Sequence, residues 1–218
     1  MTSGQSRTRS ARILRTDNRG FYTKIVLRRR FTEAIERVPV YLPACGCGVM
    51  FEQVWRAKAT YVLALDMLQE KISHLRFHHP DVDARVADIN SFCDWPVNVR
   101  FAIADFDVYG SPYRGIKNFL DSRAWSSPLY VTVTDGLPCW LGRGGLLPRE
   151  LVREGHAVRV KDTAARRKYF DAIVWPWWEG AARANGLAVH EHVVLWKKGK
   201  RVAYYALRLS NERRRRPD

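Results

Sequence analysis

Short apolar runs alternate with amphipathic segments along most of the chain. The runs predict buried strands, because a strand that is covered on both faces reads as continuously apolar. They lie at Val38–Leu42, Tyr61–Leu65, Ala84–Ala87, the start of Arg100–Tyr113, and Pro128–Thr134. Helical spacing of apolar residues occurs at Phe21–Arg37, from Gly48 to about Lys58, at Met67–Phe77, and at Ala164–Asn185 with an interruption at Pro176.

The C-terminal part of the chain departs from this alternation. Val189–Trp196 and Val202–Leu209 are separated by a short connection that contains Lys198-Gly199, which predicts a β-hairpin. The glycine-rich stretch Leu137–Pro148 predicts a loop. Strand–helix units followed by a hairpin predict a Rossmann-like α/β fold, in which a mostly parallel sheet has helices on both faces and a C-terminal antiparallel hairpin.

The predicted strands end in residues that suit a nucleotide site. Pro43–Gly48, after the first strand, is a glycine-bearing turn in which the backbone can approach a ligand closely. Asp66 ends the second strand about twenty residues further on, the spacing of an acid that binds ribose hydroxyls. Asp88, Asp107 and Asp135 follow or end the remaining three.

Arg100–Tyr113 is the stretch around which we organise the functional prediction. It places Asp105 and Asp107 at the end of a buried strand, before a turn at Gly110-Ser111-Pro112. A carboxylate at that edge of an open α/β sheet lies where ligands bind. We therefore interpret Asp107 and Tyr109 as the candidate reaction centre. This stretch alone leaves open an ordinary strand-end turn with two solvated acids.

The chain is strongly basic. A formal net charge of +15 and a pI near 10.1 indicate a polyanionic partner. We expect a flexible basic arm at 1–18, one catalytic domain at 19–210 and a basic tail at 211–218, although solubilising extensions are an alternative reading of the charge runs. Arginine grips phosphate bidentately, and the candidate nucleic-acid contacts are Arg28, Arg29, Arg213, Arg214, Arg215 and Arg216.

The cysteines and the N-terminus predict the compartment. Cys45, Cys47, Cys93 and Cys139 match neither a disulfide framework nor zinc-ligand spacing, so we expect reduced thiols and no metal. The N-terminal segment has no apolar core, and no apolar stretch is long enough to span a membrane. These features predict a cytoplasmic protein.

Three stretches carry a resemblance to a known family. Asp105–Pro112 is similar to Asp-x-Asp-Pro-Phe-Gly-Ser-Pro, and Leu129–Asp135 is similar to a strand that contains Val-Thr-x-Thr-Asp. Phe21-Tyr22, followed by Arg30, loosely matches Phe-Tyr-Asn-Pro…Asn-Arg-Asp. With these motifs the chain resembles the tRNA (guanine-N2) dimethyltransferases, which are class I S-adenosylmethionine-dependent enzymes. It departs from them at Val108, where the family has proline, and we expect it to lack their C-terminal tRNA-binding domain.

The resemblance implies roles for individual residues. S-adenosylmethionine would be the cofactor, and a guanine in structured RNA, most specifically in tRNA, would be the substrate. Asp107 would accept a hydrogen from the guanine amino group, while Phe21 and Tyr109 would stack on the base. The implied cofactor contacts are Arg30 at the carboxylate, Ala44, Gly46 and Gly48 in the turn beside the methionine part, Asp66 at the ribose, and Asp88 and Ile89 at the adenine.

Two rival functions remain open from the sequence. A DNA amino-methyltransferase would use a similar acid–aromatic turn, although Gly110–Tyr113 only half matches its Asp/Asn/Ser-Pro-Pro-Tyr/Phe motif. A non-catalytic nucleic-acid-binding protein on the same fold would also be basic, but it would not need Asp66, Asp88 and Asp107 together. The sequence leaves open the modified position, mono- versus dimethylation and the oligomeric state.

Overall fold

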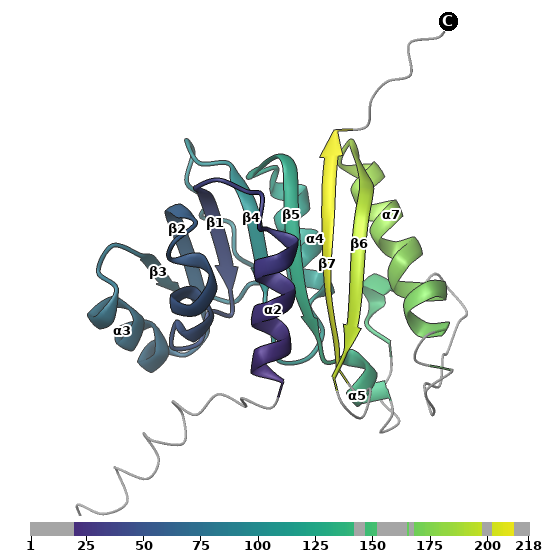
Figure 1. Cartoon of the computed structure of the whole chain (residues 1–218), viewed down its shortest axis with the longest axis horizontal. Coiled ribbons are helices and arrows are strands. Elements are labelled where there is room, and N and C mark those ends of the chain that lie inside the picture. The colour runs from purple at the N-terminus through teal and green to yellow at the C-terminus, as the bar shows by residue number, and fades with distance from the viewer. Residues whose placement is uncertain (1–19, 142–146, 152–164, 166–167, 198–201, 212–218) are drawn as a thin grey trace, which may run out of the picture.

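The computed structural model describes residues 20–141, 147–151, 165, 168–197 and 202–211. In this part of the chain seven strands form one sheet in the order β3-β2-β1-β4-β5-β7-β6 (Figure 1). The strands are β1 (Val38–Pro43), β2 (Ala59–Asp66), β3 (Asp83–Val86), β4 (Phe101–Phe106), β5 (Trp125–Asp135), β6 (Leu187–Trp196) and β7 (Ala203–Asn211). Strands β1 to β5 pair in parallel and β7 is antiparallel to both of its neighbours, which confirms the predicted fold class.

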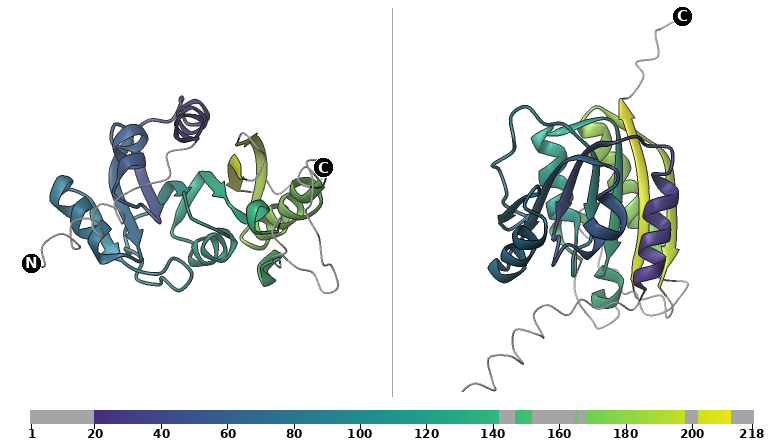
Figure 2. Two further views of the ribbon diagram at one scale, coloured as in Figure 1. Left: turned by 90° about the horizontal axis from the view of Figure 1, so that it is seen from below. Right: turned by 60° about the vertical axis from the view of Figure 1, so that its left-hand side comes forward.

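Helices cover both faces of this sheet (Figure 2). Helix α2, the π-helical turn η1 and helix α3 pack on one face, and α4 and α7 pack on the other. Their bounds, with those of the shorter helical turns, are α2 (Phe21–Phe31), η1 (Phe51–Trp55), α3 (Gln69–His78), α4 (Tyr113–Ser122), α5 (Leu137–Leu141), η2 (Arg149–Leu151), η3 (Phe170–Val174) and α7 (Trp175–Ala184).

Alternating side chains of the central strands fill both layers of the core. Tyr41 of β1 stacks on Phe119 of α4, with 5.0 Å between the ring centroids. Its neighbours Val40 and Leu42 point to the opposite face, into the cluster that contains Ile72 of α3. Because both faces are buried, these strands read as continuous apolar runs in the sequence.

The order of the strands creates a crevice at one edge of the sheet. The chain proceeds from β1 outward to β2 and β3, then returns to β4 on the other side of β1 and continues to β5. Ligands of open α/β sheets bind where the strand order reverses in this way, beyond the carboxyl ends of the strands. The turns after β1, β2, β3 and β4 all open at this edge.

Several predicted boundaries are wrong. The first helix ends at Phe31 rather than Arg37, where the hydroxyl of Thr32 donates to the carbonyl oxygen of Arg28 at 2.7 Å and the backbone leaves the helix. Helix α4 was not predicted, and α5 lies within the predicted loop. Pro176 lies in the first turn of α7, directly after the π-helical turn η3, where a missing backbone N–H is tolerated.

The hairpin prediction is confirmed by the antiparallel pairing of β6 with β7. The predicted Lys198-Gly199 connection lies outside the described residues, as do the arm 1–18 and the arginines Arg213, Arg214, Arg215 and Arg216. Strand β7 extends to Asn211, one residue into the predicted tail. Among the described residues no helix combines the length and apolar character needed to cross a membrane.

Candidate functional site

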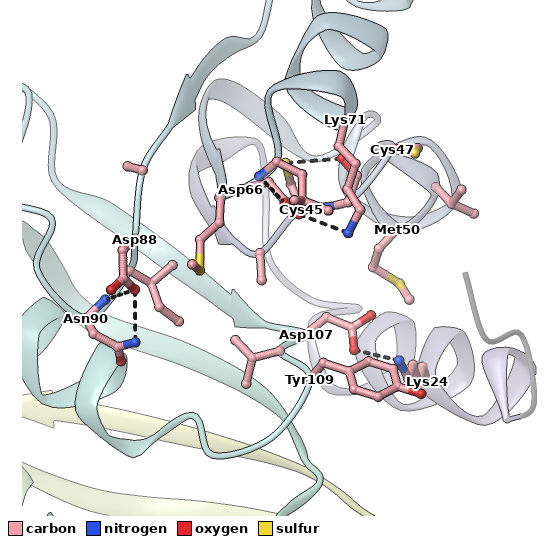
Figure 3. Close-up of a pocket in the computed structure, with 18 of the residues that line it drawn as sticks. Lys24, Cys45, Cys47, Met50, Asp66, Lys71, Asp88, Asn90, Asp107 and Tyr109 are labelled. Carbon is pink, nitrogen blue, oxygen red and sulfur yellow. Dashed lines mark hydrogen bonds and ion pairs between the residues drawn. The ribbon is translucent and has the colours of Figure 1, made fainter. Parts of the chain in front are cut away.

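A cavity of about 480 Å³ lies at the carboxyl edge of the sheet and has the size of a small-ligand pocket (Figure 3). Turns that are far apart in the sequence line it together with the N-terminal part of α2. The structure brings together eight of the ten residues that the resemblance assigned to cofactor or base, namely Phe21, Ala44, Gly46, Asp66, Asp88, Ile89, Asp107 and Tyr109.

The turn after β1 supplies the floor of the cavity. Gly46 adopts φ +58°, and a Cβ added there would meet no atom within 4 Å, so its backbone faces open space. Gly48 has φ +83° but faces the other way, because a Cβ there would lie 2.4 Å from Leu75 of α3. Gly48 allows α3 to pack closely against the turn and is not among the residues that line the cavity, and its expected cofactor contact stays a prediction.

Asp66 at the end of β2 is tied to that turn. Its Oδ2 accepts a hydrogen bond from the Gly46 amide at 3.0 Å, and its Oδ1 accepts one from the Leu68 amide at 3.0 Å. Lys71 of α3 places its ammonium 3.5 Å from Oδ2. The carboxylate is thus oriented on the cavity wall, and each oxygen retains a second lone pair with which to accept from a ligand hydroxyl.

The turn after β3 forms the opposite wall. Asp88 Oδ1 accepts from the backbone amide of Asn90 at 3.0 Å and from its side-chain amide at 2.9 Å, which fixes the turn. Ile89 lies between the cavity and α4, where a Cβ added to Gly115 would come within 2.8 Å of its side chain. An apolar side chain flanked by polar turn residues suits the flat face of a nucleobase.

Asp107 lies one residue beyond β4 at the mouth of the cavity. Lys24 of α2 donates to Asp107 Oδ1 at 2.6 Å, and the two side chains point toward one another (Figure 3). Burial alone would raise the pKa of Asp107, but the charges of Arg28 and Lys24, together with hydrogen bonds from Lys24 and Thr134, hold this pKa below its usual value. Asp107 is therefore an anion at neutral pH.

Two aromatic side chains flank Asp107 at the cavity. Phe21, at the first turn of α2, is partly buried and lines the cavity. Tyr109 also lines it but leaves 95% of its surface exposed, with neighbouring Val108 buried below it. An exposed tyrosine at the rim is free to pack against a ligand, in contrast to the core aromatics.

The prediction that Arg28 is a surface contact for nucleic acid is wrong. It is completely buried and donates to Asp105 through Nε and Nη2, the shortest of these contacts being 2.6 Å. Trp55 Nε1 at 2.7 Å and the Thr132 hydroxyl at 2.8 Å complete the set of donors to the Asp105 carboxylate. This network joins α2, η1, β4 and β5 beneath the cavity, so Arg28 anchors the helix that carries Phe21 and Lys24.

Arg30, which was expected to contact the carboxylate of the cofactor, lies away from the cavity. Arg30 is exposed and does not line the cavity. An α-helix has 3.6 residues per turn, so Arg30, six residues after Lys24, lies on a different face of α2. Arg29 is exposed as expected, and it donates to the backbone oxygen of Gln53 at 2.6 Å. The cations that line the cavity are Lys24 and Lys71, which sequence reasoning missed although Lys24 is only three residues from Phe21.

Asp135 at the end of β5 belongs to a separate buried network. Its carboxylate accepts from the hydroxyls of Tyr113 at 2.5 Å and Tyr169 at 3.2 Å, and from the backbone amide of Leu137 at 2.9 Å. Burial raises the pKa of Asp135 to about 6, although all three hydrogen bonds favour the anion. This acid lies away from the cavity and acts on stability.

Asp135 gives a prediction about stability and pH. Because its pKa is about 6 in the folded protein against 3.8 as the reference, protonation favours the fold, and stability should fall as pH rises from about 4 to 6. This difference between the two pKa values corresponds to a loss of roughly 3 kcal/mol in the free energy of unfolding. Urea unfolding of the wild type and of Asp135→Asn at several pH values should show the wild type losing this amount relative to the variant. A constant difference between the two would contradict the prediction.

Metal and thiol chemistry are not suggested by the side chains at hand. Among the residues that the structure describes, no three His, Cys, Asp or Glu side chains are grouped so as to hold a metal ion. Cys45 and Cys47 lie in the turn as free thiols, and Cys93 and Cys139 are free as well. Burial is the main cause that raises the pKa of Cys45 and Cys47, which disfavours the reactive thiolate.

Comparison with known proteins shows the fold. No protein-family model matches the sequence, and no curated protein sequence matches it. The N-methyltransferase NodS from Bradyrhizobium japonicum WM9, in complex with S-adenosyl-L-homocysteine, superposes with a TM-score of 0.56 at 11% identity over 94% of this chain and 98% of its own. M. jannaschii TYW2 in complex with AdoMet gives a TM-score of 0.59 at 10% identity, with 93% and 80% covered.

A further neighbour is described as a putative RNA methyltransferase, PH1948 from Pyrococcus horikoshii. It superposes with a TM-score of 0.50 at 14% identity over 89% of this chain and 83% of its own. Identities at this level establish similarity of fold rather than of substrate. The chain therefore has the Rossmann-like fold of class I S-adenosylmethionine-dependent methyltransferases.

Proposed function

We propose that this protein uses S-adenosylmethionine to methylate the exocyclic amino group of a guanine in structured RNA, specifically tRNA. The observation that carries the proposal is that Asp107 shares one cavity with Gly46, Asp66 and Asp88. Gly46 suits the methionine part of the cofactor, Asp66 and Asp88 suit its nucleoside part, and Asp107 is an anion where an amine would be methylated. Neighbours of the same fold that contain AdoMet or S-adenosyl-L-homocysteine support the choice of cofactor.

The residues present fit this cofactor in all but one respect. Open space above Gly46 accommodates the methionine part, Asp66 has lone pairs for the ribose hydroxyls, and Ile89 offers an apolar surface to the adenine. The exception is the amino-acid carboxylate, which was expected at Arg30. In the cavity the available cation near the turn is Lys71, whose ammonium already lies beside Asp66.

Asp66 provides a direct test of cofactor binding. Replacing it with alanine removes a charged acceptor from the ribose hydroxyls, and we expect affinity for S-adenosylmethionine to fall by about tenfold or more. Asp83→Ala is a control, because Asp83 binds Arg85 and Tyr61 and does not line the cavity. Titration calorimetry should show weakened binding for the first variant alone. Equal affinity in the wild type and Asp66→Ala would rule out this assignment.

Catalysis would rest on orientation and charge. When bound, the cofactor supplies a methyl group activated by its sulfonium. An exocyclic amine on an aromatic ring is a weak nucleophile, because its lone pair is delocalised into the ring. Asp107 would accept a hydrogen bond from that amine, stabilise the positive charge that develops on nitrogen, and take the proton that the methylated amine loses. Phe21 and Tyr109 would hold an extruded base between them.

The substrate class rests on charge and on the exposed rim. A net charge of +15 suits a phosphate backbone, and contacts of this kind position a nucleic acid without reading its sequence. Arg29 is an exposed residue of α2, the helix that carries Phe21 and Lys24 at the cavity, and it remains a candidate phosphate contact. The expected contributions of Arg213, Arg214, Arg215 and Arg216 concern residues outside the described part, and they remain proposals.

Transfer of a labelled methyl group tests the proposed function against its rivals. The full chain is incubated with methyl-labelled S-adenosylmethionine and, separately, with unmodified tRNA transcripts and with DNA of mixed sequence. We expect label in tRNA and none in DNA. Label in DNA alone would favour a DNA amino-methyltransferase, and cofactor binding without transfer to any nucleic acid would contradict the choice of substrate. Absence of cofactor binding would favour a non-catalytic nucleic-acid-binding protein.

A further inference from the structure

Lys24 and Asp107 form a paired donor and acceptor inside the cavity. The Lys24 ammonium lies 2.6 Å from Asp107 Oδ1, and the two side chains retain 16% and 22% of their exposure. Both therefore touch the space that a base would occupy. This exposure separates the pair from the completely buried pair of Arg28 and Asp105 below it.

The surroundings hold Lys24 in this place. Its ammonium lies 5.7 Å from the centroid of the Tyr204 ring, which approaches from β7. Arg28, the other cation near Asp107, is 3.9 Å away and is engaged in hydrogen bonds with Asp105. Thr134 of β5 adds a hydrogen bond to Asp107. Lys24 is thus the cation beside Asp107 that lines the cavity, whereas Arg28 approaches Asp107 from the buried side.

The pair presents hydrogen-bonding groups in a defined order. An ammonium has three donors, and only one is used by Oδ1. A carboxylate has about four lone-pair sites over its two oxygens. Read from Lys24 across Asp107, the order is donor, acceptor, acceptor. The Watson–Crick edge of guanine presents the complementary order, with O6 as acceptor and the N1 hydrogen and N2 amine as donors.

We propose that Lys24 is a specificity-determining residue that donates a hydrogen bond to guanine O6 while Asp107 accepts from N1–H and the N2 amine. This inference rests on the proposed function and extends it to the choice of base. Adenine and cytosine carry an acceptor ring nitrogen beside their amine, which would face the Asp107 carboxylate and be repelled. A site built to hydrogen-bond a polar group rejects analogues that lack it, because its own buried groups are then left unpaired.

Single-atom replacement in the substrate tests this proposal. The probes are a tRNA transcript in which the wild-type enzyme methylates guanine, and the same RNA with 6-thioguanine at that one position. The analogue keeps N1–H and the N2 amine but replaces O6 with sulfur, a weaker acceptor. Single-turnover transfer is measured for the wild type, Lys24→Met and Lys24→Arg. Lys117→Met is the matched control, since Lys117 is an exposed lysine of α4 outside the cavity.

We expect Lys24→Met to slow transfer to guanine by about tenfold or more and transfer to 6-thioguanine by less than about threefold, as loss of one charge-assisted hydrogen bond predicts. Lys24→Arg should retain part of the preference for guanine, and Lys117→Met should behave as the wild type. Equal slowing on both RNAs would overturn the proposal, since Lys24 would then only hold Asp107. Weaker cofactor binding by Lys24→Met would also overturn it, because Lys24 would then contact the cofactor.

The failure of the underlying function is distinguishable from these outcomes. If the wild-type enzyme methylates no guanine in any tRNA transcript, the proposed function falls and the inference about Lys24 falls with it. If the wild type methylates guanine but does not distinguish it from 6-thioguanine, the proposed function stands and only the role of Lys24 is overturned.

Discussion

Asp107→Asn should reduce single-turnover methyl transfer by roughly a hundredfold or more, while affinity for S-adenosylmethionine stays within about twofold of the wild type. The amide keeps the size of the carboxylate but cannot stabilise the positive charge on the methylated amine or take its proton. Asp107 has a low pKa in the folded protein, so the wild type already holds the required anion at neutral pH. Rapid-quench kinetics and calorimetry give the two quantities.

A matched control separates this effect from a general loss of acidic charge. Asp121 is an exposed acid of α4 that pairs with Lys117, and Asp121→Asn should transfer methyl groups at the wild-type rate. A near-normal rate for Asp107→Asn would show that another acid does the chemistry. Asp105 and Asp135 do not qualify by position, because each is buried and engaged in its own network of donors outside the cavity.

Arg28→Met should lower the free energy of unfolding by about 3–5 kcal/mol, which is the usual cost of leaving a buried charge without its partner. The Asp105 carboxylate would keep only neutral donors, Trp55 and Thr132, in a site with almost no solvent. The change would also release the helix that carries Phe21 and Lys24, so activity should fall together with stability. Urea unfolding followed by circular dichroism measures the loss.

The neighbouring residue of the same helix supplies the control for Arg28. Arg29 is exposed, so Arg29→Met should change stability by no more than about 0.5 kcal/mol. The double variant Arg28→Met, Asp105→Leu should recover much of the loss, because it removes both charges. A destabilisation below about 1 kcal/mol for Arg28→Met alone would contradict the role of the buried pair as an anchor.

The sequence predicted the parts of the site that follow from local pattern. Asp66, Asp88 and Asp107 were found because each follows an apolar run, and the carboxyl ends of parallel strands meet at one edge of a sheet. The parallel order of the strands and the closing hairpin followed from the same runs. Helix α4 was missed because Gly110-Ser111-Pro112 was read only as a turn, whereas Pro112 also suits the start of a helix.

The errors concern side chains whose environment depends on distant residues. Arg28 stands in a run of three arginines and reads as a surface charge, but its partner Asp105 is 77 positions away and becomes its neighbour only in the fold. Lys24 was overlooked for the same reason, since its partner Asp107 lies 83 positions away, just after β4. At Gly48 the turn pattern predicts a cofactor contact, and it does not reveal that α3 packs directly against this glycine.

Identification of the methylated nucleoside tests the central claim most directly. Unmodified tRNA transcripts are treated with the full chain and S-adenosylmethionine, digested to nucleosides and analysed by mass spectrometry, with Asp107→Asn as the parallel reaction. We predict N2-methylguanosine, with or without the N2-dimethyl form, in the wild-type reaction and at most about a hundredth as much with the variant at an early time point. Methyl groups found on adenosine or cytidine, or N2-methylguanosine formed equally well by both proteins, would contradict the claim.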